Sequence, residues 1–332
     1  MSTRIIHKKN DTAGVVPVIS GDATNELELG EIAINTHDGK MFIRQDADGA
    51  ISLKEIGKAD SAENVLYVSK SGSNTNDGKT LGTAFASIKA ALDSLAVLEA
   101  ANAGSTAGTT IFVKSGTYVE NNDTPSDPAE ATANPMGGMV VPKNVSIVGD
   151  NLRTTRVSGT TPGNDLFYVQ NASYITNLTF TGLHEDSNKP RPPAAVSFPP
   201  IALQAGNIAQ EIVTSPYVEN CTSFCRNATG MLIDGSLTTG LRSMVSDSYT
   251  QINAGGRGVH IINRGYAQLV SIFTVSCDYA ILCESGGQCS LTNSNASFGN
   301  YGLKATGASD SLYAGAVTSD SVTFDTDIEI TT

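Results

Sequence analysis

Tryptophan is absent from this chain of 332 residues, and charged residues, at 16%, fall well below the proportion of about a quarter that globular domains carry. Because 40% of the residues are hydrophobic, the chain can still build a core, which excludes a largely disordered protein. The missing charges are replaced by 32 glycines and by many serine, threonine and asparagine residues. This composition is typical of short strands joined by tight turns and disfavours a helix bundle.

Basic residues are also scarce, since 21 lysines and arginines stand against 33 acidic residues and give a net charge of −12. Phosphate binding needs a basic surface, so we expect no nucleic-acid partner. The opening MSTRIIHKKN lacks the apolar stretch of a secretory signal. No apolar run approaches the roughly 18 residues that cross a bilayer, so we expect no membrane insertion and a soluble chain made in a cytoplasm.

The cysteines lack the spacing of a metal site. No second pair of cysteines or histidines at zinc spacing accompanies the pair at 221 and 225. An odd number of cysteines in a chain without a secretory signal predicts reduced thiols that fill apolar space. We expect neither a cofactor nor a metal; the five cysteines are Cys221, Cys225, Cys277, Cys283 and Cys289.

Residues 1–58 have the alternation of a small β module. Apolar and polar residues alternate over 30–35, an Asp-Gly turn follows in 36–40, and a second apolar strand occupies 41–44. This order predicts a β-hairpin. Because two strands are marginally stable alone, we expect the module to pack on copies of itself or on a partner.

Residues 59–139 change character again. Strands are predicted at 65–69 and 110–113, with a polar loop and a helix between them. The helix follows from apolar residues at positions 85, 88, 91, 92 and 95. Residues 121–138, rich in Pro, Asn, Asp and Gly, predict a loop.

From residue 140 onward the sequence repeats. The stretch that starts at Gly265 aligns without a gap on the stretch that starts at Gly287, an offset of 22 residues. A weaker repeat aligns 174–180 with 217–223, 43 residues apart. The equivalent positions include Ala267 with Cys289, Leu269 with Leu291, Tyr279 with Tyr301, and Ile281 with Leu303.

A repeat of about 20–25 residues built from short strands predicts a solenoid. The leucine-rich-repeat frame is missing, so a parallel β-helix fits better. We expect equivalent apolar residues to stack inside it, and Asn and Ser at the coil corners to hydrogen-bond between coils. Roughly seven coils fit between 140 and 305, which at about 4.8 Å per strand gives a rod of about 35 Å.

One part of the chain resembles the beginning of a pectin-lyase-like right-handed β-helix. The resemblance rests on 66–69, 72–78, 85–88, 111–120 and 145–150, and continues as repeats to about 305. In that superfamily a helix caps the open end of the first coil. It implies an all-β fold: a right-handed parallel β-helix, a solenoid of about 22 residues per coil, with a small N-terminal β module and a capping helix. It says little about activity, since many members are not enzymes.

The start of the chain resembles the N-terminal segment of bacteriophage tail fibres and related virion proteins. That family commonly carries a Gly-Glu-hydrophobic-Ala-hydrophobic-Asn stretch, then Asp-Gly-Lys and an apolar strand, as residues 30–43 do. The resemblance implies a module that docks a homotrimeric fibre onto other tail or baseplate proteins, in a virion tail assembled in the host cytoplasm. The motif residues implied in virion attachment are Gly30, Glu31, Ile32, Asn35, Asp38, Gly39 and Lys40.

These resemblances and the composition divide the chain into four predicted regions. They are an N-terminal virion-attachment β module (1–58), the start of the β-helix with its capping helix (59–139), the parallel β-helix (140–305) and a C-terminal cap (306–332).

A catalytic β-helix would need carboxylates on neighbouring coils, hence acidic residues about 22 positions apart. The repeat instead places Asp278 on Asn300 and Glu284 on Thr306. We predict that Asp234 and Asp247 lie on different faces of one coil, and the sequence does not fix the register of Glu211 and Glu219. The arginines between 195 and 303 are too far apart to share a base role; they are Arg226, Arg242, Arg257 and Arg264.

The histidines have no partner spacing either. His260 lies in an alternating strand, so we expect it to face solvent or an interface. The others are His7, His37 and His184.

We therefore expect the chain not to be an enzyme. It is interpreted as a structural part of a phage virion, a short tail fibre or a baseplate-associated adaptor, attached by its N-terminal module with a rigid β-helix projecting outward. The alternative is a tailspike that binds or depolymerises a host polysaccharide as a lyase or hydrolase. Exposed Tyr and Asn residues and the Pro-rich insert at 189–200 would then contact the host surface glycan.

Overall fold

The computed structural model describes residues 8–19, 26–56, 64–123, 135–198, 215–235, 242–307 and 328–331. The chain forms two compact units, Met1–Ser61 and Ala62–Thr332, and each is described by itself. The predicted cap at 306–332 falls largely outside the described residues, as does most of the loop predicted at 121–138.

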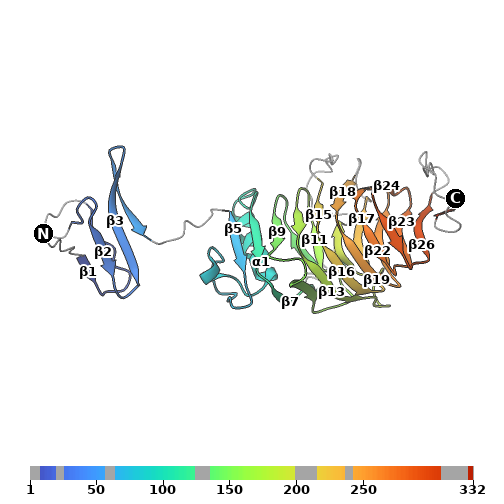
Figure 1. Ribbon diagram of the computed structural model, residues 1–332, viewed down its shortest axis with the longest axis horizontal. Helices are drawn as coiled ribbons and strands as arrows, with labels where there is room; N and C mark the ends of the chain where they lie inside the picture. The colour runs from blue at the N-terminus through green and yellow to red at the C-terminus, as the bar shows by residue number, and fades with distance from the viewer. Residues whose placement is uncertain are drawn as a thin grey trace. The chain divides into compact units, whose positions relative to one another are not determined.

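The N-terminal unit is a four-stranded sheet in the order β1-β2-β3-β4 (Figure 1). The predicted hairpin is confirmed, because β2 and β3 pair antiparallel with Asn35 opposite Lys40. β1 adds to β2 in parallel. Three apolar side chains, Leu27, Ala33 and Phe42, are buried as its core. The strands are β1 (Lys8–Asn10), β2 (Ile32–Asn35), β3 (Lys40–Ala47) and β4 (Ala50–Ile56).

The second unit is a right-handed parallel β-helix with three sheets of seven to eight strands, as predicted (Figure 1). Sheet 1 contains β5 (Val65–Val68), β6 (Thr110–Val113), β9 (Ser146–Gly149), β12 (Tyr174–Thr176), β15 (Tyr217–Glu219), β18 (Arg242–Asp247), β21 (Gly265–Val270) and β24 (Gln288–Thr292). Sheet 2 contains β7 (Gly116–Glu120), β10 (Thr155–Gly159), β13 (Thr179–His184), β16 (Thr222–Arg226), β19 (Thr250–Ala254), β22 (Phe273–Val275) and β25 (Asn295–Ser297). Sheet 3 contains β8 (Met139–Val141), β11 (Phe167–Val169), β14 (Ala194–Phe198), β17 (Thr229–Asp234), β20 (Arg257–Ile262), β23 (Tyr279–Glu284), β26 (Tyr301–Thr306) and β27 (Ile328–Thr331).

The register of the coils is the one that the repeat predicts. Leu269 lies opposite Leu291 and Ala267 opposite Cys289 in sheet 1. The weaker repeat also holds, although its offset is 43 residues, because the Tyr217 strand β15 pairs directly with β12. Longer insertions therefore enter between strands and leave the stacking intact.

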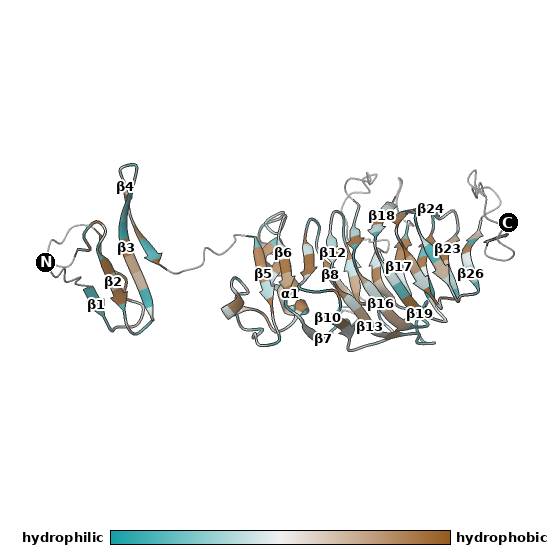
Figure 2. Ribbon diagram, viewed as in Figure 1, coloured by the Kyte–Doolittle hydropathy of each residue, from teal (hydrophilic) through white to brown (hydrophobic). Residues whose placement is uncertain are grey.

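Inward side chains of successive coils stack in columns that are largely apolar, although the buried Ser246 interrupts one of them. One column in sheet 1 runs through four fully buried residues, and Figure 2 shows apolar residues recurring from strand to strand. Each such side chain contributes about 1.5–3 kcal/mol by leaving water. The residues of this column, in register, are Ile111, Ile147, Ile175 and Val218.

The corner between sheets 1 and 2 is a ladder of left-handed residues with φ between +45° and +60°. Asn and Ser suit this position because their short polar side chains tolerate a left-handed backbone and hydrogen-bond locally. As expected from the sequence, they also bond between coils: Asn220 Nδ2 donates to Asn177 Oδ1 at 2.5 Å and Asn293 Nδ2 to Ser271 Oγ at 3.3 Å. The ladder consists of Asn177, Asn220, Ser248, Ser271 and Asn293.

The first coil is closed by helix α1 (Ile88–Ala101), which confirms the predicted helical period. Its apolar side is buried, with Ile88, Ala91, Leu92 and Leu95 in the same core as the coils. Short helix η1 (Leu81–Thr83) precedes it. The edge of β5, the first strand of sheet 1, hydrogen-bonds to the backbone of Gly78 and Phe85, so it is not free to pair with another strand.

A buried carboxylate fixes the start of this helix. Glu120, 1% exposed at the end of β7, accepts 2.9 Å hydrogen bonds from the backbone N–H groups of Ile88 and Lys89. The Ser87 side chain caps the next free N–H, that of Ala90, at 3.2 Å. Burial raises the pKa of Glu120 above its ordinary value, and the helix N–H groups oppose that shift.

This carboxylate makes the stability of the β-helix depend on pH. Between the ordinary glutamate pKa and the raised value, Glu120 holds more of its proton in the folded state than in the unfolded state, so its contribution to the free energy of unfolding falls as pH rises. Glu120→Gln should remove this slope, and should lower stability by about 1–3 kcal/mol because one helix N–H loses its acceptor. Urea unfolding between pH 4.5 and 7 measures both, with the exposed Glu185→Gln as control. A pH dependence that is identical in the wild type and in Glu120→Gln would contradict the assignment.

Candidate functional site

The motif implied in virion attachment surrounds the hairpin of the N-terminal unit. Gly30 and Gly39 take φ of +80° and +66°, which glycine adopts without strain at these two turns. Ile32 is half-buried on β2, and Lys40 Nζ lies 4.0 Å from Glu55 Oε2 across β3 and β4.

Asn35 is the centre of this motif. Its side chain is buried, and its Nδ2 donates to the carbonyls of Thr12 and Val15, each at 2.9 Å, and to Asp38 Oδ2 at 3.0 Å. Its Oδ1 accepts from the backbone N–H groups of His37 and Asp38 at 2.9 and 3.1 Å. One amide thus joins the segment after β1 to the β2–β3 turn.

The two acidic motif residues are also engaged within the unit. Glu31 accepts a hydrogen bond from the Glu28 N–H at 2.9 Å and forms an ion pair with Lys8 Nζ at 3.1 Å. The hydrogen bond from Glu28, and to a lesser extent Lys8, lowers the pKa of Glu31. A hydrogen bond from His37 and one from the Gly14 N–H lower the pKa of Asp38. The motif side chains therefore hold the unit together.

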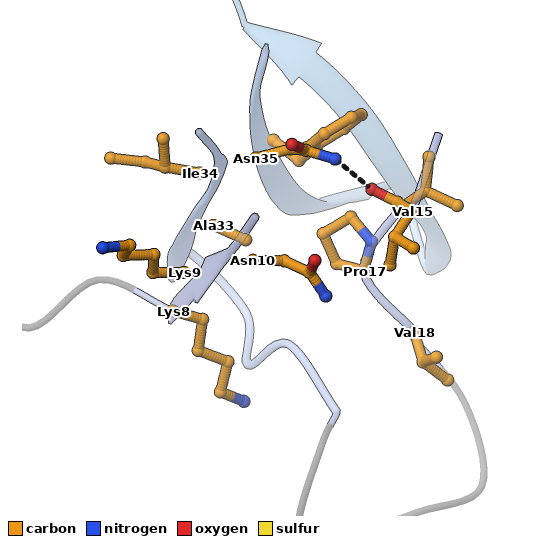
Figure 3. Close-up of a pocket in the computed structure, with 11 residues that line it drawn as sticks. Lys8, Lys9, Asn10, Val15, Pro17, Val18, Ala33, Ile34 and Asn35 are labelled. Atoms are coloured by element: carbon orange, nitrogen blue, oxygen red, sulfur yellow. Dashed lines mark hydrogen bonds between the residues drawn. The ribbon is translucent and has the colours of Figure 1, made fainter. Parts of the chain in front are cut away.

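A cavity of about 380 Å³ lies beside the motif (Figure 3). In Figure 3 Asn10 lies opposite Val15, Pro17 and Val18, whereas the side chains of Lys9 and Ile34 point away from them. The two lysines are the only charged residues among its lining, which is otherwise apolar apart from two asparagines. The lining residues are Lys8–Asn10, Val15–Val18, Ala33–Asn35 and Phe42.

The N-terminal unit exposes more large apolar side chains than it buries. Against the three buried residues of its core, six large apolar residues of its described part are exposed, several by about half. Three of them, Val15, Val16 and Val18, line the cavity together, and exposed apolar groups that lie together mark a contact surface. The six are Val15, Val16, Val18, Leu29, Met41 and Ile51.

The β-helix carries a second polar and aromatic group on the outer face of sheet 1. Tyr174 and Tyr217 are opposite each other in register, with ring centroids 5.5 Å apart. Two residues further along, Glu219 lies opposite Asp247 on the next coil. The Tyr174 hydroxyl donates to the Glu219 carboxylate, and burial together with Glu219 raises the pKa of Tyr174 to about 12.

The sequence did not reveal this carboxylate pair, because it lies outside the 22-residue frame. Tyr217 is opposite Val245, an offset of 28 residues, so the coil is longer than the clearest repeat. The signal that could have found it is the alternation of residues 217–219 and 243–247, aligned with a longer gap. As predicted, Asp278 stacks on Asn300, whose Nδ2 donates to Asp278 Oδ1 at 3.0 Å. Glu284 lies opposite Thr306, also as predicted. Glu211 lies outside the described residues.

The expectation for His260 is wrong. It is 6% exposed, and its Nε2 lies 2.6 Å from Glu284 Oε2 on the adjacent coil. Burial, reinforced by the nearby Arg257 charge, lowers the pKa of His260 to about 4. The alternation of residues correctly placed His260 on the outward face of β20. At this position, however, the outward face is buried. His37 and His184 are exposed, and His7 lies outside the described residues.

The cysteines are free thiols, and four of the five are buried. Burial raises the pKa of Cys221 to about 12 and that of Cys225 to about 11, so both stay protonated at neutral pH. Within the described ranges, no three His, Cys, Asp or Glu residues gather as a metal site requires. No helix in that part of the chain is long and apolar enough to span a bilayer.

The Pro-rich insert is anchored to the β-helix through its first half, at Arg191 and Ala194. Arg191 makes a two-pronged ion pair with the fully buried Asp165, at 2.9 and 2.6 Å. Asp165 also accepts from the Ala194 N–H at 2.7 Å. The insert then continues into the buried strand β14, so its described part offers little free surface for a glycan.

No family model and no curated protein matches the chain. Two solved structures are similar in fold. One is ORF18 of Geobacillus virus E2, at 13% identity and a TM-score of 0.32, covering 92% of this chain and 66% of that one. Another is a rhamnogalacturonan lyase, at 10% identity and a TM-score of 0.26, covering 74% of this chain and 68% of that one. The chain thus spans about two thirds of the length of each.

The expectation that the chain is not an enzyme is wrong. A rhamnogalacturonan lyase is among the similar structures. The argument from the residues fails as well, since Glu219 and Asp247 do lie on neighbouring coils.

The role of Asn35 predicts a selective effect of its removal. Asn35→Ala breaks five hydrogen bonds of a buried side chain and should destabilise the N-terminal unit by about 3 kcal/mol, which its small core cannot offset. Hydrogen exchange of the full chain should show loss of protection in β2 and β3 while the β-helix stays protected. Asp11→Ala, at an exposed residue of the neighbouring segment, is the control. Unchanged protection in β2 would contradict this role.

Proposed function

We propose that the chain is a structural component of a phage virion, a short tail fibre or baseplate-associated adaptor. Its N-terminal unit attaches it to a tail or baseplate protein, and the rigid β-helix projects outward. The observation that carries the proposal is the exposed apolar surface of a unit with three buried core residues, since exposed apolar side chains that lie together mark an interaction site. The tail-fibre motif that forms this unit gives the partner's class.

The first test is the position of the chain in the particle. Quantitative mass spectrometry of purified phage should find the intact chain at a fixed number of copies per virion. A host-expressed protein that never associates with the particle, mixed in before purification, is the control for carry-over. Absence of the chain from intact particles would refute the proposal.

Trimer formation is the second part of the proposal, and sheet 2 supplies the surface for it. Phe224 and Phe273 are 60% and 42% exposed on the outer face of this sheet, and Ile252 lies beside Phe224 in register. Although the chain is acidic, the strands of sheet 2 place no carboxylate on this face; Glu120 points toward α1. The exposed Arg156 and Arg226 also lie on this face, so its apolar part is the group Phe224, Ile252 and Phe273, which suits contact with further copies of the chain.

Sedimentation of the purified full chain tests this surface. The wild type should sediment as a trimer, and the double variant Phe224→Ser, Phe273→Ser as a monomer with an unchanged circular dichroism spectrum. Val97→Ser removes an apolar side chain that is 70% exposed on α1, and should stay trimeric. A monomeric wild type, or a variant that remains trimeric, would contradict the proposal.

A second function, binding or cleavage of a host polysaccharide, is favoured by the outer face of sheet 1. Neighbouring strands of a sheet lie about 4.8 Å apart. Two carboxyl groups about 5–10 Å apart can divide the acid and base roles of glycoside hydrolysis. Glu219 and Asp247 occupy neighbouring strands, and Tyr174 and Tyr217 lie beside them as flat apolar surfaces with hydroxyl groups.

Incubation with host capsular polysaccharide separates binding from cleavage. If this face acts, Glu219→Gln or Asp247→Asn should lower the release of new reducing ends or unsaturated products by about 100-fold or more. Asp93→Asn, on the exposed side of α1, should have no effect. If the polysaccharide neither binds nor yields products with the wild type, this second function is refuted and the virion role is unaffected.

A further inference from the structure

The cavity of the N-terminal unit has a size and a lining that suit side chains of another chain. Its size is one argument. An apolar cavity of about 150 Å³ holds one benzene ring, so about 380 Å³ has room for two bulky apolar side chains. Alternate residues of an extended segment present two such side chains on one face, about 6.6 Å apart.

The walls of the cavity favour apolar side chains. Ala33 and Phe42 are buried at the sheet side, whereas Val16 and Val18, on the opposite wall, are 57% and 48% exposed. Asn35, a polar lining residue, uses its side-chain amide for hydrogen bonds within the unit. The Oδ1 of the other lining asparagine, Asn10, accepts from the Thr12 N–H at 2.7 Å. An apolar occupant would therefore cover the valines while these side-chain hydrogen bonds stay in place.

The charge of the rim selects the kind of segment. Lys8 and Lys9 are the charged lining residues, and Lys8 is already paired with Glu31. Lys9 is exposed and makes no ion pair with a described residue. A carboxylate beside the apolar side chains would meet this free cation.

The strand next to the cavity offers backbone as well. β1 lies at one end of the strand order of its sheet, so among the described residues its outer edge has no strand neighbour. Extended peptides bind to such edges through main-chain hydrogen bonds, and pockets beside the edge select alternate side chains.

We propose that this cavity binds an extended segment of another protein that carries two bulky apolar residues at positions i and i+2 and an acidic residue next to them. The segment adds along β1, seats its apolar side chains between Val16, Val18 and Phe42, and pairs its carboxylate with Lys9. This inference deepens the proposed attachment function, on which the identification of the partner as a tail or baseplate protein rests.

Fluorescence anisotropy of a labelled peptide tests the site on the full chain. The probe is an eight-residue peptide of alternating valine and glutamate, with the valine and lysine peptide as its counterpart. The wild type should prefer the glutamate peptide. Val16→Ser with Val18→Ser should weaken binding about tenfold or more, and Lys9→Glu should reverse the preference between the two peptides.

Matched controls change the same residue types outside the cavity. Val97→Ser replaces an apolar residue of α1 that is 70% exposed, and Lys54→Glu reverses an exposed charge on β4; neither should alter binding. Loss of binding in these controls as well, or equal affinity of the wild type for both peptides, would overturn the proposal. Circular dichroism melting of each variant shows that it is folded.

Other occupants give different results. If the valine variants fail to bind because they dissociate the oligomer, the cavity holds a second copy of the chain, and the proposal fails. If peptide binds only after removal of residues 1–7, the chain fills its own cavity, and it fails too. Peptide binding by a chain that is absent from virions would refute the proposed function but leave the site intact; presence in virions without peptide binding would do the reverse.

Discussion

Every strand in the interior of the β-helix finds its hydrogen-bonded neighbours one coil earlier and one coil later, so each coil must bring its inward side chains back to the same place. This constraint explains why the inward side chains of sheet 1 stack in columns, and why offsets of 22, 28 and 43 residues all end in register. Extra residues can enter only between strands. The same constraint puts left-handed residues one above another at the corners, where Asn and Ser are favoured over bulkier side chains.

A stack of coils has two ends, and the first is closed by a helix and a buried carboxylate rather than by another coil. Helix α1 covers the apolar interior, and Glu120 reaches from the first strand of sheet 2 to hold the start of the helix. The N-terminal unit has a much smaller apolar core than the β-helix. There Asn35 replaces apolar burial with a dense set of hydrogen bonds, which leaves a cavity and several valines open to a partner.

The stacking was predictable because equivalent residues repeat, and Ala267 opposite Cys289 shows that it held even where the residue types differ. The helix was predictable from its apolar period. The sequence could not reveal Glu219 opposite Asp247, since the pairing depends on the length of one coil. His260 was misplaced because alternation gives the face of a strand but not what covers that face. The motif at 30–40 was found by resemblance, but its contacts within the unit depend on residues 12–15, which no local pattern joins to it.

Photo-oxidative cross-linking of native tyrosines tests the register most directly, because it needs no substitution. Tyr279 and Tyr301 are opposite each other with rings stacked 5.1 Å apart, and Tyr174 and Tyr217 lie 5.5 Å apart. Peptide mapping by mass spectrometry should find dityrosine links within these two pairs. If tyrosines are joined at other offsets while these two links are missing, the coils do not stack as described.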